Sequence, residues 1–338
     1  MKQFLLAAGS TDPGGLCQVQ AEIPEPGDAE VLVRIHAASL NFRDLAIAAG
    51  KYPGGPVQRD TVPLSDGAGE VVAVGKGVTR FAAGDRVAAT FFQGWVSGAP
   101  DFASMPSLGY DADGVLTEYA VFAEHGLVPL PEHLSYEEAA TLPCAGVTAW
   151  HALMGIKPVC EDDTVLLLGT GGVSILGLQL AHMLGAKTIV TSGSDEKLER
   201  ARELGADETI NYKATPEWDE EILRLTGGAG VDHILEVGGV GTLARSFRSV
   251  GFGGNIALIG VLGGPEGDTN PQPLMLKNAS LTGIFVGDRS TFEAMNDAIA
   301  TNGLRLLVDR VFEFDAAPEA YQWQHEGRHF GKIVVSVG

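Results

Sequence analysis

The chain has 338 residues, of which 45% are hydrophobic and 20% charged, a balance typical of globular proteins and a length that fits two domains. Its net charge of -20 argues against a nucleic-acid partner, because the phosphates would be repelled. No apolar run reaches the length of about 20 residues that spans a bilayer. The three scattered cysteines, Cys17, Cys144 and Cys160, form no disulfide framework. We therefore expect a cytoplasmic protein without a membrane or nucleic-acid partner.

The first 125 residues carry short apolar runs between glycine turns, a pattern typical of a β-rich domain. Strands are expected over Phe4–Ala8, Val31–Ile35, Gly69–Val74 and Arg86–Ala89. The segment Phe91–Gly114 contains Trp95, Phe102 and Tyr110 among glycines and prolines, and predicts a long loop. Such a loop either lies over a ligand cleft and sets specificity or is a plain surface excursion.

From Ser135 onward the pattern changes to alternating strands and helices, and Ser135 with Glu138 predicts a capping box at the first of these helices. Strands are expected over Thr164–Leu168, Lys187–Val190, Val231–Val237, Asn255–Ile259 and Leu281–Val286, with helices over Val173–Leu184 and Glu196–Leu204. Bare apolar strands alternating with helices indicate a parallel sheet covered on both faces. After Gly287, a helix over Thr291–Thr301 and a strand over Lys332–Val337 predict a return to the first domain. The predicted domains are therefore 1–130, 131–286 and 287–338.

A glycine-rich loop connects the first of these bare strands to a long helix. It comprises Gly169, Thr170, Gly171, Gly172, Val173 and Ser174. In a dinucleotide-binding fingerprint the first glycine makes the tight turn, the second lets the backbone approach the diphosphate, and the third allows close helix–strand packing. Gly169 and Gly171 suit the first two roles, and Ser174 stands at the third. An ordinary turn is the alternative, but the βαβ setting favours a diphosphate bound by the free N–H groups of the helix start.

The end of the second strand predicts which nicotinamide cofactor binds. An acidic residue about 20 positions after the loop usually accepts hydrogen bonds from the ribose 2′-hydroxyl of NAD. Here Ser192 and its neighbours end the strand, and Asp195 belongs to the first turn of the next helix, where an acid suits the helix dipole. A 2′-phosphate could instead be met by Ser192, Lys197 and Tyr212. We therefore expect a preference for NADPH, with NADH as the alternative.

Several segments together resemble the medium-chain dehydrogenase/reductase superfamily along essentially the whole chain. They are Ser39–Leu45, Asp66–Val72, Gly84–Val87 and the hinge-like Leu142–Trp150. Within the superfamily the chain is most similar to the zinc-free, quinone-oxidoreductase-like branch, whose members are often described as NAD(P)-dependent alcohol dehydrogenases. The resemblance implies an α/β protein with a GroES-like, β-rich catalytic domain and a Rossmann domain with a doubly wound parallel sheet.

The metal-ligand positions of the zinc-bearing relatives can be compared residue by residue. Those relatives hold a catalytic zinc with a Cys, a His and a second Cys, and place a Glu beside the His. This chain has Asn41 at the first position, Ser65 and Asp66 at the His-Glu pair, and only Cys144 at a matching ligand. One thiolate and an amide do not make a three-ligand catalytic site, and the closely spaced cysteines of a structural zinc site are missing. We therefore expect no metal, and Cys144 as a small buried core residue.

By the same resemblance, Asn41 contacts the nicotinamide or the substrate, and Tyr52 donates a hydrogen bond to the substrate. Arg43 takes the place where alcohol dehydrogenases have a hydroxyl for proton relay, so it either orients a phosphate or carbonyl group or pairs with Asp66. The alternatives are structural: Asn41 satisfies a loop, Tyr52 packs beside Pro53, and Arg43 forms an ion pair only.

Other contacts to the cofactor are expected where later strands end, because ligands of open α/β sheets bind there. These residues are Gly238, Gly260, Val261, Leu262, Phe285 and Val286; the resemblance adds Thr148 below the nicotinamide and Phe330 and Lys332 closing over the cofactor. The run Leu281–Val286 is also a candidate sheet edge for pairing with a second subunit in a homodimer, by analogy.

Three functions follow as hypotheses. The first is an NADPH-dependent reductase of quinones, enones or other activated carbonyls, favoured because an activated acceptor needs less polarisation than a simple ketone. The second is a zinc-independent alcohol or aldehyde dehydrogenase, which would need a general acid that the sequence does not name. The third is a non-catalytic nucleotide-binding protein, against which Asn41 and Tyr52 argue.

Overall fold

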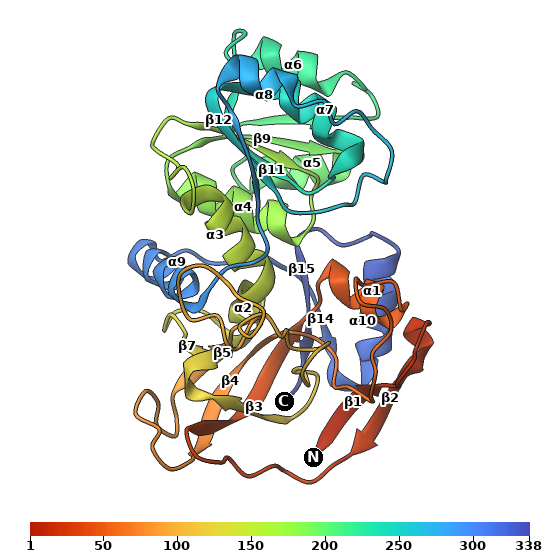
Figure 1. Ribbon diagram of the computed structural model, residues 1–338, viewed down its shortest axis with the longest axis vertical. Coiled ribbons are helices and arrows are strands. Elements are labelled where there is room, and N and C mark those ends of the chain that lie inside the picture. Colours follow the sequence, from red (N-terminus) through yellow and green to blue (C-terminus); the bar gives the residue numbers. More distant parts are fainter. The chain divides into compact units, whose positions relative to one another are not determined.

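A computed structural model describes residues 1–338, and the chain divides into two compact units (Figure 1). Unit 1 comprises Met1–Val147 and Gly287–Gly338, and unit 2 comprises Thr148–Val286. The last segment of the chain thus returns to unit 1 from Gly287, where the sequence places the return. The other boundary lies at Val147, whereas the sequence predicts it at residue 130, because the helical segment Ser135–Gly146 packs with unit 1. No helix is long and apolar enough to cross a bilayer.

Unit 1 is built on a seven-stranded sheet with the order β14-β15-β3-β4-β5-β7, in which β6 pairs with β3. Its strands are β3 (Glu30–Ser39), β4 (Asp66–Val74), β5 (Arg86–Ala89), β6 (Tyr119–Ala123), β7 (Leu127–Pro129), β14 (Val308–Glu313) and β15 (Lys332–Ser336). A separate antiparallel pair is formed by β1 (Lys2–Leu6) and β2 (Leu16–Gln20). The helices are α1 (Phe42–Ala48), α2 (Tyr136–Ala139), α9 (Arg289–Asn302) and α10 (Ala317–His325), and Leu142–Gly146 forms a π-helical turn, η3.

The register of this sheet places three distant parts of the chain at one end of it. Ser39, at the end of β3, pairs with Asp66 at the start of β4 and with Val334 near the start of β15, both antiparallel. The residues that follow β3 and those that begin β4 and β15 therefore lie together, although they are far apart in the sequence.

Unit 2 is a six-stranded sheet of the order β10-β9-β8-β11-β12-β13, and every neighbouring pair is parallel. Its strands are β8 (Thr164–Leu168), β9 (Lys187–Ser192), β10 (Glu208–Asn211), β11 (Val231–Glu236), β12 (Val250–Leu258) and β13 (Ser280–Gly283). Its helices are α3 (Val147–Met154), α4 (Gly172–Met183), α5 (Asp195–Glu203), α6 (Trp218–Leu225), α7 (Val240–Ser249) and α8 (Gln272–Lys277). This strand order is that of the Rossmann fold, and it confirms the predicted doubly wound sheet.

Most strand predictions differ from the structure by one or more residues at their ends, and two of these differences have a cause in the backbone. The first strand ends at Leu6 and not at Ala8, because the chain turns through Gly9, whose φ is +73°. The strand predicted over Leu281–Val286 covers only Ser280–Gly283, and Val286 has a φ of +58°, which is outside any extended conformation.

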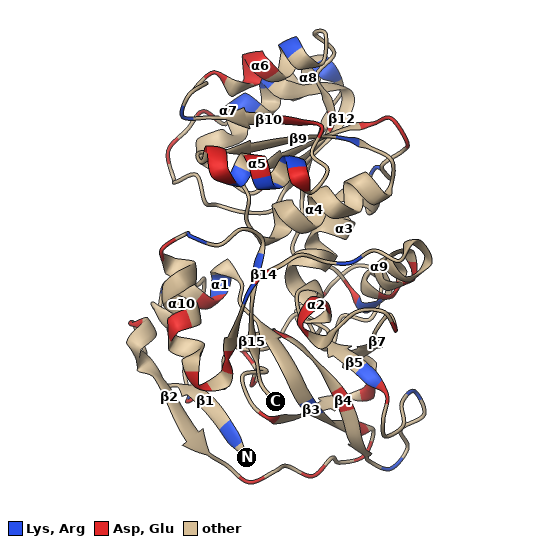
Figure 2. Cartoon of the chain, turned by 180° about the vertical axis from the view of Figure 1, so that it is seen from behind, with Lys and Arg blue, Asp and Glu red and all other residues tan.

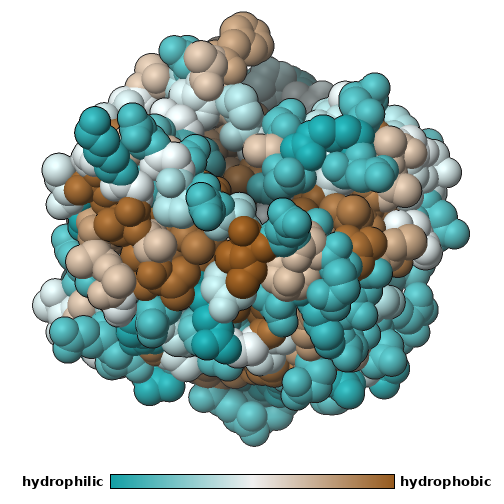
Figure 3. Space-filling view, turned by 90° about the horizontal axis from the view of Figure 1, so that it is seen from below, coloured by the Kyte–Doolittle hydropathy of each residue, from teal (hydrophilic) through white to brown (hydrophobic).

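The surface agrees with the composition. The chain has 43 acidic and 23 basic residues, which are spread over both units in Figure 2, and α5 carries both signs. Seen from below, hydrophobic side chains gather across the middle of the face and hydrophilic ones surround them (Figure 3). In unit 1 the exposed hydrophobic residues include Val72 and Val74 on β4.

Candidate functional site

The glycine loop of unit 2 lies between β8 and α4, as the fingerprint predicts. Gly169 has a φ of +76°, which favours glycine, and a Cβ added at Gly169 or at Gly171 would meet nothing within 4 Å. The first N–H groups of any helix lack intrahelical acceptors, and no side chain caps those of α4. Open space above a glycine loop and uncapped N–H groups fit the diphosphate of a dinucleotide.

Two residues of α4 share the packing role that the fingerprint gives to its third glycine, and sequence reasoning missed the second of them, Gly177. Ser174 is buried, and its hydroxyl donates a 2.6 Å hydrogen bond to the carbonyl of Leu168, which ties α4 to the end of β8. One turn later, a Cβ on Gly177 would lie 2.7 Å from Leu235 Cδ2 and 2.9 Å from Leu167 Cδ2. Gly177 therefore permits the close approach of helix and sheet. A glycine inside an otherwise apolar helix was the available signal.

The cofactor residues predicted in unit 2 lie mostly at one edge of the sheet. Since all strands are parallel, their carboxyl ends share an edge. There lie Gly169–Ser174 after β8, Ser192 at the end of β9, Tyr212 after β10, Gly238 after β11, Gly260, Val261 and Leu262 after β12, and Phe285 and Val286 after β13. Lys197 lies in the first half of α5, and Thr148 is buried in α3. Phe330 and Lys332 are buried in unit 1, and their contact with a cofactor stays a prediction.

The region after β9 carries a hydroxyl and an ammonium near the backbone of Gly193. A Cβ on Gly193 would lie 2.8 Å from the Tyr212 hydroxyl and 2.8 Å from Lys213 Cε, so both side chains cover this backbone. Sequence reasoning named Tyr212 but missed Lys213. Asp195 lies in the first turn of α5, as expected, and its Oδ1 accepts a 2.6 Å hydrogen bond from Asn211 Nδ2.

The loop after β11 is held by a carboxylate that the sequence did not single out. Glu236 is fully buried, and its Oε1 accepts hydrogen bonds from the N–H of Gly238 (2.8 Å), the N–H of Gly239 (3.0 Å) and the hydroxyl of Thr242 (2.6 Å). Its other oxygen accepts from the Ser246 hydroxyl. Glu236 thus fixes the backbone of Gly238, a predicted cofactor contact.

The segment after β13 owes its shape to a histidine of α3. Val286 is a buried β-branched residue in the left-handed region, a rare combination that costs energy. Its carbonyl oxygen lies 2.7 Å from His151 Nδ1. Strained backbone of this kind gathers at ligand sites, and Phe285, immediately before it, is 54% exposed.

In unit 1, the residues at the metal-ligand positions form one polar cluster, hereafter the Asn41 cluster: Asn41, Ser65, Asp66, Cys144 and Lys332. Lys332 Nζ lies 2.5 Å from Asn41 Oδ1 and 3.5 Å from Asp66 Oδ2. Asp66 also accepts hydrogen bonds from the Ser65 hydroxyl (2.7 Å) and from the Cys144 N–H (3.1 Å). The sheet register described above brings these residues together.

The donor set of the Asn41 cluster does not fit a zinc ion. Nowhere in the chain do three or more His, Cys, Asp or Glu side chains come together so as to hold a metal. Of the residues in the cluster only Cys144 offers a side chain that zinc usually binds at such a site, and beside it stand an amide, a hydroxyl and an ammonium. Cys144 as a residue is partly exposed, its thiol is buried and its N–H donates to Asp66, so it belongs to this polar cluster and not to an apolar core.

Arg43 and Tyr52 stack on one another near this cluster. The Arg43 guanidinium lies 5.0 Å from the Tyr52 ring centroid and 4.4 Å from that of Phe91. It donates hydrogen bonds to the Leu108 carbonyl (2.9 Å) and to the Ser107 hydroxyl (2.8 Å). The alternative of an Arg43–Asp66 ion pair is therefore wrong, because Asp66 pairs with Lys332 and Arg43 holds the loop. Burial raises the pKa of the Tyr52 hydroxyl, so it remains a donor at neutral pH.

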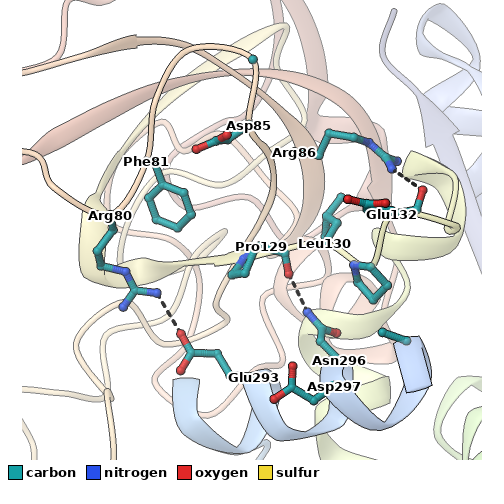
Figure 4. Close-up of a pocket in the computed structure, with 13 residues that line it drawn as sticks. Arg80, Phe81, Asp85, Arg86, Pro129, Leu130, Glu132, Glu293, Asn296 and Asp297 are labelled. Carbon is teal, nitrogen blue, oxygen red and sulfur yellow. Dashed lines mark hydrogen bonds and ion pairs between the residues drawn. The ribbon is translucent and has the colours of Figure 1, made fainter. Parts of the chain in front are cut away.

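A separate pocket of about 850 Å³ in unit 1 contains none of the predicted site residues (Figure 4). Its arginines are engaged with the protein: Arg80 pairs with Glu293 at 2.8 Å, and Arg86 donates to the carbonyls of Glu132 and Leu134. Asn296 donates to the carbonyl of Pro129. We therefore do not place the active site there.

Comparison with known proteins agrees with both units. Residues 27–132 match the model of the alcohol dehydrogenase GroES-like domain, and residues 172–301 match that of the zinc-binding dehydrogenases. The chain is 46% identical over 328 residues to a zinc-type alcohol dehydrogenase-like protein of Schizosaccharomyces pombe, covering 94% of this chain and 93% of the relative. The chain belongs to the medium-chain dehydrogenase/reductase superfamily.

Two further relatives represent the two activities of interest. Human quinone oxidoreductase is 28% identical over 307 residues, covering 89% of this chain and 86% of that protein. The crystal structure of an NAD-dependent alcohol dehydrogenase is 34% identical and covers 100% of both chains with a TM-score of 0.89. This medium-chain dehydrogenase/reductase is accordingly an NAD(P)-dependent oxidoreductase with a GroES-like domain and a Rossmann domain.

Proposed function

We propose that this protein is a zinc-independent oxidoreductase that transfers a hydride between NADPH and a quinone, an enone or another activated carbonyl compound. The observation that carries this proposal is the Asn41 cluster, where the amide of Asn41 and the hydroxyl of Ser65 stand at positions that metal ligands would need and the ammonium of Lys332 lies beside them. Such a cluster offers hydrogen-bond donors and no Lewis acid, which suits an acceptor that is already activated.

A dinucleotide bound on unit 2 would supply the hydride, and the residues of unit 1 would stabilise the charge that the acceptor gains. As the acceptor carbon takes up the hydride, its electron pair moves to oxygen. The donors that we assign to this oxygen are the amide of Asn41 and the hydroxyl of Tyr52, which lies against Arg43 near the cluster. Each hydrogen bond to a developing oxyanion is worth about 10²- to 10³-fold in rate. The proton that completes the reduction comes from water.

The preference for NADPH rests on the groups after β9. No carboxylate ends this strand, and the Tyr212 hydroxyl and Lys213 both cover Gly193. Lys197 follows in α5. A 2′-phosphate is better matched by hydroxyl and ammonium groups than by a carboxylate, although one solved relative is NAD-dependent. The ratio of kcat/KM for NADPH and NADH tests this, and a clear NADH preference would contradict it.

The reaction itself is tested by following the absorbance of the reduced nicotinamide. The protein is given first a panel of quinones and enones and then a panel of simple aldehydes. We expect turnover of the first panel by protein treated with a chelator. Activity restricted to simple alcohols and aldehydes would favour the dehydrogenase alternative. Cofactor binding without turnover of either panel would favour a non-catalytic nucleotide-binding protein.

The proposal extends to a homodimer formed through β13. This strand is the last of the unit 2 sheet and is paired on one side only, with β12. Leu281 on this strand is 38% exposed, and Phe285 just after it is 54% exposed. An edge strand with exposed apolar side chains is suited to pairing with a second copy.

A further inference from the structure

The most unusual group in unit 1 is the ammonium of Lys332, because it is almost completely buried. Only 3% of this residue is exposed, and Nζ lies 2.5 Å from the Leu40 carbonyl and 2.5 Å from Asn41 Oδ1. Its charge is balanced by Asp66, whose own exposure is 0%. Burying an ion pair is costly unless its hydrogen bonds are satisfied, and here both partners have such bonds.

The ammonium determines which way the Asn41 amide points. An ammonium group can only donate hydrogen bonds, so the amide atom that faces it must be the oxygen. The NH₂ group of Asn41 is thereby turned away from Lys332. One of its hydrogens is directed to the Ser65 hydroxyl over a long 3.5 Å contact, and the other is left to donate to a ligand.

The backbone of Asn41 is held as well. Asn41 is the N-cap of α1, and its N–H donates a 2.6 Å hydrogen bond to Asp44 Oδ2. The residue is 8% exposed. With its backbone fixed by Asp44 and its amide oxygen fixed by Lys332, the NH₂ group has little freedom to rotate, which is what a preorganised donor requires.

We propose that Lys332 is a positioning residue that holds the Asn41 amide with its NH₂ group toward the carbonyl oxygen of the acceptor. The inference rests on the function proposed above and goes beyond it. The positive charge on Nζ also polarises the amide through Oδ1, because hydrogen bonds in a chain strengthen one another, and so makes Asn41 a better donor to a developing oxyanion. Lys332 acts through Asn41 and itself contacts neither the acceptor nor the cofactor, and this role takes the place of the cofactor contact expected from the resemblance.

A double-mutant cycle tests this coupling. Lys332→Met alone would leave the buried Asp66 carboxylate without its cation, so the cycle uses the neutral pair Lys332→Met with Asp66→Asn. We expect Asn41→Ala to lower kcat at least tenfold and the neutral pair to lower it to a similar extent. In both, KM and the Kd for NADPH should change less than about twofold. The triple variant should be no slower than Asn41→Ala alone, because coupled residues are not additive.

A matched control is available in unit 2. Lys277 is another lysine whose ammonium holds backbone carbonyls, those of Phe247, Arg248 and Val250. Lys277→Met should leave kcat, KM and the Kd for NADPH unchanged. A readout without turnover is the melting temperature, which should fall in Lys332→Met and recover when Asp66→Asn is added.

Three results would overturn the inference. The first is a triple variant whose loss is the product of the separate losses. The second is a neutral pair whose loss appears in the Kd for NADPH and not in kcat, which would make Lys332 a cofactor residue. The third is a neutral pair with full activity. A wild-type protein that binds NADPH but turns over no acceptor would instead refute the proposed function, and with it the catalytic role of Lys332, whichever way the melting temperatures move.

Discussion

Asp44 combines a structural role with an unusual protonation equilibrium. It closes the capping box of α1 by accepting from the Asn41 N–H, yet it is buried and its Oδ1 has no hydrogen-bond partner. Burial raises its pKa to about 6, against the opposing charge of Arg43. The folded state therefore favours the neutral acid, while the unfolded chain has an ordinary aspartate with a pKa of about 3.9.

The sign of the resulting pH dependence follows. Because the pKa of Asp44 is raised in the folded state, its contribution to stability is greatest below about pH 4 and is lost as the pH rises toward about 6. In Asp44→Asn this loss is absent while an amide oxygen still accepts from Asn41. The difference in the free energy of unfolding, Asp44→Asn minus wild type, should thus be about 2 kcal/mol larger at pH 7.5 than at pH 4.5. Urea denaturation at the two pH values measures it, and an unchanged difference would refute it.

Two glycines of the same loop and helix should separate binding from packing. A Cβ at Gly171 meets no atom, and its φ of -84° suits alanine, so Gly171→Ala should keep its melting temperature but raise the Kd for NADPH at least tenfold by occupying the space of the diphosphate. Gly177→Ala should behave in the opposite way. Overpacking against Leu167 and Leu235 costs about 1–3 kcal/mol, less a gain of up to about 1 kcal/mol in helix propensity.

Calorimetry with NADPH and thermal unfolding of both variants provide the comparison. A destabilised Gly171→Ala with unchanged affinity would mean that the loop does not face the diphosphate. A fully stable Gly177→Ala would mean that α4 does not lie as close to the sheet as the structure has it.

At the level of elements, the long segment between β5 and β6 is tied to α1 through Arg43. Two residues of this segment, Ser107 and Leu108, accept hydrogen bonds from its guanidinium, and Tyr110 in the same segment packs edge-on against Tyr52 with ring centroids 4.9 Å apart. The predicted loop over Phe91–Gly114 is thus anchored beside the Asn41 cluster. Its role in specificity stays a prediction.

Removing this anchor should loosen the loop. Arg43→Met keeps the aliphatic stem against Tyr52 and Phe91 but deletes both hydrogen bonds. We expect KM for the acceptor to rise at least fivefold, with the Kd for NADPH unchanged, since the loop belongs to unit 1. Arg328→Met is a suitable control, because Arg328 in the same unit pairs with Glu326 and lies over the Trp323 ring, outside this segment. Steady-state kinetics decide, and a fall in kcat at constant KM would show that Arg43 contacts the reacting groups instead.

The elements that sequence alone predicted best are those whose pattern is local. β5 and β8 have the predicted bounds, because a bare apolar run between turns is visible without any tertiary context. The glycine loop was found for the same reason. β13 was predicted too long because Val286 is held in a left-handed conformation next to His151, from an element more than a hundred residues away. The partner of Lys332 was likewise invisible, since only the pairing of β15 and β4 with β3 brings residues 332, 66 and 41 together.

For the whole molecule, the net charge of -20 opposes any self-association. The proposed dimer must therefore rest on backbone pairing and apolar contact at the β13 edge, and added salt should strengthen it by screening the repulsion between two acidic chains. This dependence distinguishes it from a dimer held by surface ion pairs, which salt would weaken.

The β13 edge can be blocked with one charge. We expect light scattering to give twice the chain mass of 35.4 kDa for the wild type and a mass nearer to 35.4 kDa for Leu281→Lys, because lysine on an edge strand opposes pairing with another strand. Phe252→Lys is the control: Phe252 is 80% exposed in the same unit but lies on β12, so its variant should remain a dimer. A wild-type mass of 35.4 kDa at all salt concentrations would exclude the dimer, and a dimeric Leu281→Lys would move the interface away from β13.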